Sequence, residues 1–123
     1  MKLLTKLCSS LAKVMPAQTD KDFIPYASAA ALQGETFSFQ LAYRMEEVLG
    51  GAIQLNVQGG ELSKHIRVRT VELAPVRFTA FSHDDDIISK DPGLYPDILK
   101  EYRGSFRIPT DQWRTFWIDV KIP

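Results

Sequence analysis

Residues 36–44 read TFSFQLAYR, and this stretch decides the fold class. Large apolar side chains take every second position, and serine, glutamine and alanine lie between them. Successive side chains of a β-strand point to opposite faces, so this alternation predicts a strand with one face buried. An amphipathic helix would instead repeat its apolar residues every three or four positions. We therefore expect a β-strand that lies against a core.

Two further segments continue the alternating pattern along the chain. Residues 53–57 follow a glycine pair at 50–51, whose backbone freedom suits a tight turn. We therefore expect 53–57 to pair antiparallel with 36–44 as a hairpin. Residues 65–71 predict the next strand, with a bulge or bend near Thr70 where the apolar positions change phase.

Residues 113–122 predict the last strand. Its aliphatic side chains fall on one face, while Trp113 and Trp117 share the other. Paired tryptophans are candidates for stacking on a sugar, but packing under a loop or against another domain is the favoured explanation. A weaker strand is expected at 27–32, ending at Gly34.

Two structures fit the first residues of the chain. Leucine and valine at positions 4, 7, 11 and 14 repeat at helical spacing, which indicates an amphipathic helix. Residues 10–15, which end before Pro16, also fit an edge strand. We favour the strand, because this segment resembles the opening strand of the family described below.

Residues 82–105 are polar and rich in proline, glycine and aspartate, so we expect one long loop. Such a long loop within a compact domain is uncommon and often functional. Its candidate contacts to a sugar or to a neighbouring domain are His83, Asp84, Asp85, Asp86, Tyr95 and Asp97.

Simpler explanations exist for these loop residues. The cluster at 83–86 lacks the alternating acidic ligands and the sixth-position glycine of a calcium loop, so we expect no metal there. Tyr95 and Asp97 lie in a segment framed by Pro92 and Pro96, which favours a rigid turn without any ligand.

Charge and composition exclude several kinds of partner. Fifteen basic residues balance fifteen acidic ones in the 123-residue chain, so no net field attracts nucleic acid. Residues 1–14 lack the continuous apolar run of a secretory signal, and no segment approaches the roughly 20 apolar residues of a membrane span. We expect a cytoplasmic location and neither a nucleic-acid nor a membrane partner. Cys8 is the only cysteine and is expected to be a buried thiol.

Several stretches resemble, in the same order, the N-terminal domain of glycoside hydrolase family 123 and of related bacterial proteins. The stretches are AALQGETFSFQLAYR (30–44), PVRF (75–78), HDDD (83–86), DPGLYPDIL (91–99) and QWRTFW (112–117). LAKVMP (11–16) is similar to the opening strand of that domain.

The resemblance implies a β-sandwich that precedes a (β/α)8 barrel. It also implies a parent enzyme that removes terminal β-linked N-acetylgalactosamine, with the acetamido group of the sugar as the nucleophile. The catalytic acids of the family lie in the barrel, so the resemblance gives this chain neither a catalytic residue nor a cofactor.

We therefore expect residues 1–123 to form a single all-β domain, an antiparallel β-sandwich with one long loop. The chain leaves its last apolar strand without a polar tail, so more protein is expected to follow. The primary hypothesis is a non-catalytic accessory domain whose loop, at 82–103, packs against the following catalytic domain. The alternatives are a stand-alone interaction domain or a carbohydrate-binding module. The module would use Tyr95, Asp97, Trp113 and Trp117.

Overall fold

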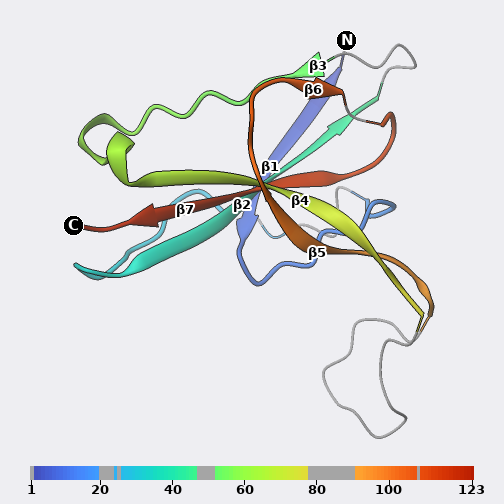
Figure 1. Cartoon of the computed structure of the whole chain (residues 1–123), viewed down its shortest axis with the longest axis horizontal. Coiled ribbons are helices and arrows are strands. Elements are labelled where there is room, and N and C mark those ends of the chain that lie inside the picture. The colour runs from blue at the N-terminus through green and yellow to red at the C-terminus, as the bar shows by residue number, and fades with distance from the viewer. Residues whose placement is uncertain (1, 20–23, 25, 47–51, 78–90, 108) are drawn as a thin grey trace, which may run out of the picture.

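The strand predicted most strongly from the sequence lies inside the main sheet. The computed structural model describes residues 2–19, 24, 26–46, 52–77, 91–107 and 109–123 (Figure 1). Its strands are β1 (Leu3–Ser9), β2 (Thr36–Met45), β3 (Ala52–Ile53), β4 (Ile66–Val76), β5 (Gly93–Glu101), β6 (Phe106–Arg107) and β7 (Arg114–Lys121). A short 3-10 helix, η2 (Gly60–His65), precedes β4.

Five strands form one open antiparallel sheet in the order β1-β2-β7-β4-β5 (Figure 1). The short strands β3 and β6 pair separately. This confirms the all-β class and the strands at 36–44 and 113–122. Within the described ranges, no second sheet of full-length strands faces the first.

One face of the sheet, which we call the core face, carries the main apolar cluster. Tyr43 and Phe116 lie on the neighbouring strands β2 and β7, with ring centroids 4.9 Å apart. Tyr102 meets Phe116 edge to face at 5.3 Å. Ile53 and Leu55 pack on the same cluster from the segment that begins with β3. These side chains bury apolar area, the dominant favourable term in folding.

The expected hairpin between 36–44 and 53–57 is wrong. β2 pairs with β1 on one side and with β7 on the other, so neither of its edges is left for a third strand. The apolar residues Ile53 and Leu55 are not in the main sheet but pack on top of its core face. The Leu55 backbone N–H donates to the Tyr102 hydroxyl at 2.9 Å, which replaces a ladder bond.

The N-terminal segment forms a strand, as favoured, but not at the expected residues. β1 covers Leu3–Ser9, while 10–15 is a turn followed by irregular chain. The helical spacing misled because both faces of β1 carry leucine: Leu3 and Leu7 lie on one, and Leu4 lies on the other. Because apolar residues lie on both faces of β1, its sequence does not show the alternation of apolar and polar residues by which a strand is recognised.

The long loop expected at 82–105 is wrong in its second half, because β5 occupies Gly93–Glu101 and β6 follows. Proline argued against a strand here, but β5 is an edge strand, where a missing N–H is tolerated. The register jumps from Glu72–Ile98 to Leu73–Pro96, which leaves Asp97 as the extra residue of a bulge. The prediction of a bulge in the strand near Thr70 is therefore wrong in its strand, because the register shift faces Glu72 and Leu73 of β4 but the extra residue lies on β5.

The weak strand expected at 27–32 is also wrong, since these residues are irregular and mostly exposed. A turn follows in which the Glu35 N–H donates to the Leu32 carbonyl at 3.1 Å. Gly34 in this turn has φ of +83°, a conformation that glycine adopts without strain. Small alanines offer little side-chain area for cross-strand pairing, which explains why the segment does not join the sheet.

Truncating Phe116 tests the core. Phe116→Ala is expected to lower the free energy of unfolding by about 3–5 kcal/mol, because a buried ring that contacts Tyr43 and Tyr102 is lost. Urea denaturation followed by circular dichroism measures this. Leu32→Ala is the control, since Leu32 is 77% exposed and its loss should cost less than about 0.5 kcal/mol. Equal effects of the two changes would contradict the core assignment.

Candidate functional site

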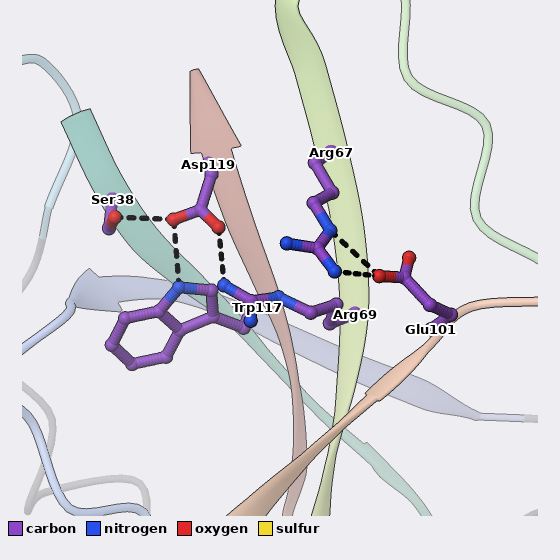
Figure 2. A network of polar contacts seen from close by, with 6 residues as sticks. All are labelled: Ser38, Arg67, Arg69, Glu101, Trp117 and Asp119. Atoms are coloured by element: carbon purple, nitrogen blue, oxygen red, sulfur yellow. Dashed lines mark hydrogen bonds and ion pairs between the residues drawn. The ribbon is translucent and has the colours of Figure 1, made fainter. Parts of the chain in front are cut away.

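The face opposite the core face carries a polar network centred on Asp119 of β7. Its carboxylate accepts hydrogen bonds from the Ser38 hydroxyl at 2.5 Å and from the Trp117 indole N–H at 2.9 Å (Figure 2). Its second oxygen accepts from the Arg69 guanidinium at 2.5 Å. The pairing of strands produces this cluster, because Ser38 lies directly opposite Asp119 and Arg69 lies opposite Trp117.

The network keeps Asp119 ionised. Burial on the sheet raises the pKa of its carboxyl group, but the hydrogen bonds from Ser38, Trp117 and Arg69 and the charge of Arg69 together outweigh burial. The resulting pKa lies below the ordinary value. Every partner donates a hydrogen bond to the carboxylate. The carboxylate therefore holds the Trp117 indole ring and the Arg69 guanidinium group in place.

A second ion pair extends the network towards the edge of the sheet. Arg67 of β4 donates from Nε to Glu101 of β5 at 2.7 Å, and a second guanidinium nitrogen contacts the same oxygen (Figure 2). The hydrogen bond lowers the pKa of Glu101 and raises that of Arg67. Both side chains are exposed, so the pair adds little to stability but orients the Arg67 side chain.

A groove of about 350 Å³ adjoins this network. The ring of Trp117 lines it together with Leu99 of β5 and with Lys13 and Leu11 from the segment that follows β1. Asp97, the bulge residue, also lines the groove and forms an ion pair with Lys13. The groove therefore combines an aromatic ring, apolar side chains and charged groups within one concave surface.

Gln40 anchors the wall of this groove. Its side-chain amide is buried and donates to the carbonyl oxygens of Ser9 at 3.1 Å and Ala12 at 2.7 Å. Its oxygen accepts from the Thr115 hydroxyl at 3.0 Å. The segment after β1 is thereby tied to the centre of the sheet, which holds Lys13 over the groove.

The structure brings two of the sequence-predicted site residues together. Asp97 and Trp117 line the same groove, although they come from β5 and β7. Trp113 is 0% exposed and packs with Cys8, so it offers no surface to a sugar. Tyr95 is buried, and its hydroxyl donates to the Asp91 carbonyl at 2.5 Å.

The four remaining residues of the predicted site belong to the loop expected at 82–105. His83, Asp84, Asp85 and Asp86 lie outside the described residues.

Sequence reasoning missed the residues that organise the site. Ser38, Gln40 and Asp119 are ordinary polar positions on alternating strands, and their importance depends on which strands are neighbours. One signal was available in the sequence: polar residues occupy every second position of the strands at 36–44 and 113–122. Once β2 and β7 are paired, these side chains lie on the same face of the sheet.

Cys8 is a structural thiol. It is buried in a small cluster with Val14, Ala42 and Trp113, and burial raises the pKa of its thiol. A raised pKa reduces the thiolate fraction, which is the nucleophilic form.

The described chain contains no group of three or more histidine, cysteine, aspartate or glutamate side chains arranged to hold a metal ion. In the same part of the chain, no helix has the length and apolar character required to cross a membrane.

No protein-family model matches the sequence, and no curated protein shows significant similarity to it. The resemblance to glycoside hydrolase family 123 therefore stays a prediction from the motifs.

Neutralising Asp119 tests the network. Asp119→Asn is expected to reduce the free energy of unfolding at pH 7 by about 2 kcal/mol, because charged hydrogen bonds are lost. The folded pKa lies below the unfolded value of about 3.9, so the wild-type advantage is complete above that pH. It disappears as pH falls through the folded pKa.

Urea denaturation between pH 7 and pH 2.5 should therefore show the two proteins converging below about pH 4. Asp97→Asn serves as control, since its exposed ion pair with Lys13 should cost less than about 1 kcal/mol. A gap between wild type and Asp119→Asn that stays constant over this range would refute the role of the carboxylate.

Proposed function

We propose that this chain is a non-catalytic domain that packs against a second domain of a glycoside hydrolase. The observation that carries the proposal is the surface opposite the core face, where an immobilised tryptophan lies beside oriented arginines and exposed leucines. We call it the docking surface and define it by Leu11, Lys13, Arg67, Asp97, Leu99 and Trp117.

The docking surface has the composition of a protein interface. Tryptophan and arginine are enriched at such interfaces, whereas lysine and aspartate are depleted, and here Lys13 and Asp97 neutralise each other as an ion pair. Leu11 and Leu99 are 93% and 38% exposed, so a partner could bury further apolar area here.

Most of the polar groups beneath the docking surface hydrogen-bond to one another, although the Nε of Arg69 is buried without a hydrogen-bond partner among the described residues. Asp119 fixes the Trp117 indole, and Glu101 orients Arg67. Groups that are held in place before binding lose little conformational entropy when a partner arrives. The network therefore supports a preformed binding surface better than it supports acid–base catalysis, in which a group must exchange protons.

In this proposal the five-stranded sheet is one layer of a β-sandwich. The second layer includes the β3–β6 pair and the chain after β3, and its support is the packing of Ile53 and Leu55 on the core face. The domain precedes a (β/α)8 barrel, which carries the catalytic acids and acts on β-linked N-acetylgalactosamine. That part rests on the family resemblance of the motifs.

A second candidate function is carbohydrate binding by the same groove. Its volume of about 350 Å³ is at the lower end of small-ligand sites, and it combines the ring of Trp117 with the charged groups of Asp97 and Lys13. Sugars bind to such mixtures of an aromatic face and hydrogen-bonding groups. Here the Lys13–Asp97 ion pair would have to open to offer its polar groups.

Tryptophan fluorescence separates the two functions. Trp113 is fully buried and Trp117 is half-buried, so a ligand in the groove changes mainly the emission of Trp117. For a docking domain we expect no saturable change with N-acetylgalactosamine, N-acetylglucosamine or galactose up to about 50 mM, a concentration well above a Kd of about 1 mM. A saturable response that Trp117→Phe removes and Leu32→Ala preserves would establish sugar binding instead.

Hydrogen exchange tests docking directly. The complete gene product should protect the amides of β5 and of the C-terminal half of β7 more strongly than the isolated chain does, because a partner covers them. Trp117→Ala should reduce this difference, while Leu32→Ala leaves it unchanged. Identical exchange in both proteins, or a coding sequence that ends after Pro123, would overturn the proposal.

A further inference from the structure

The strand β1 lies at one edge of the main sheet, and within the described part of the chain β2 is its only pairing partner. The Glu46 N–H donates to the Lys2 carbonyl at 3.0 Å, which identifies this pair as a hydrogen-bonded position of the antiparallel ladder. Such positions alternate along a strand. The backbone N–H and C=O groups of Leu3, Thr5 and Leu7 therefore point away from β2, to the outer edge.

This edge carries few of the features that normally protect an exposed strand, and Lys6 is the one charged residue of β1. β1 contains no proline, and its register with β2 runs without a bulge. Leu3 and Leu7 are 42% and 40% exposed, and they flank the uncharged Thr5 on the core face. Natural edge strands usually carry lysine, proline, bulges or inward charges, which hinder pairing with another chain, and β1 has only the first of these.

The opposite edge of the sheet is different. β5 contains Pro96 within the strand and a bulge at Asp97, and it ends with Lys100 and Glu101. These are the devices that block edge-to-edge pairing. The contrast indicates that β1 is the edge available to a partner.

We propose that β1 pairs antiparallel with β1 of a second copy of this chain, about a two-fold axis at Thr5. In this register Leu3 lies opposite the partner's Leu7, and Thr5 lies opposite the partner's Thr5. All the outward-pointing backbone groups of Leu3, Thr5 and Leu7 then find partners, because each hydrogen-bonded pair exchanges two bonds.

The sequence of β1 favours a second copy over an unrelated strand. A two-fold interface must be complementary to itself, and the pattern Leu3–Thr5–Leu7 is apolar at both ends and symmetric about its centre. The apolar pairs lie on the core face, next to a groove of about 360 Å³ lined by Leu7 and Phe39 among others. Zero net charge also removes long-range repulsion between copies.

Lys6 limits the strength of this dimer. It lies on the other face of β1, opposite the partner's Leu4 and diagonal to the partner's Lys6, where like charges repel weakly. Salt screens such exposed charges. One strand pair is also a small interface, so the dimer should be reversible, dependent on concentration and stronger at high salt.

Sedimentation velocity of the purified chain tests the dimer. We expect a shift from monomer to dimer as protein concentration rises, with a larger dimer fraction in 500 mM than in 50 mM NaCl. Thr5→Pro removes an outward N–H without removing a bond to β2 and should weaken association at least tenfold. The control Leu94→Lys alters the other edge of the sheet at a residue that is 54% exposed and lies outside the docking surface, and it should leave association unchanged.

Disulfide trapping reports the register. Hydrogen-bonded antiparallel pairs have Cα atoms about 5.5 Å apart, which a disulfide can span. In a Cys8→Ser background, Thr5→Cys should form a covalent dimer on oxidation, and Lys6→Cys should do so much more slowly. A wild-type chain that remains monomeric at all concentrations, or equal trapping at positions 5 and 6, would overturn the proposal; denaturation curves confirm that each variant is folded.

Discussion

The pairing of β2 with β7 is the contact on which the rest of the structure depends. Eight residue pairs join Thr36–Tyr43 to Arg114–Lys121, and both faces of the sheet are built on this ladder. On one face the pairing places Tyr43 beside Phe116, the centre of the apolar cluster. On the other it places Ser38 and the Gln40 amide beside β7, which creates the Asp119 network and the anchor of the groove.

Alternation of apolar and polar residues predicted the central strands of the sheet correctly. It failed where the same pattern is also compatible with irregular chain that packs on the core. Residues 36–44 and 113–122 were recognised, because a buried face on a central strand requires period two. The same alternation at 53–57 produces only the two-residue strand β3, followed by chain that packs over the core face. Proline suggested a loop at 93–101, but the edge position of β5 tolerates it.

The candidate site was harder to predict than the fold. Trp117 and Asp97 were selected for their side-chain chemistry, and they do line one groove. Trp113 and Tyr95 were selected on the same grounds, yet they are buried, because composition does not reveal which aromatic faces solvent. The organising residue, Asp119, became visible only when the neighbours of β7 were known, since its three donors come from three different strands.

The order of strands has a consequence for the nascent polypeptide. β2 is synthesised early, but its second neighbour, β7, follows only after β3, β4, β5 and β6. Until then Phe39, Leu41 and Tyr43 have no permanent cover on that side, and only β1 can pair with their strand. Because contacts between residues far apart in the chain require the closure of long loops, the sheet cannot be completed until β7 has been synthesised, and exposed apolar residues of β2 favour aggregation or chaperone binding until then.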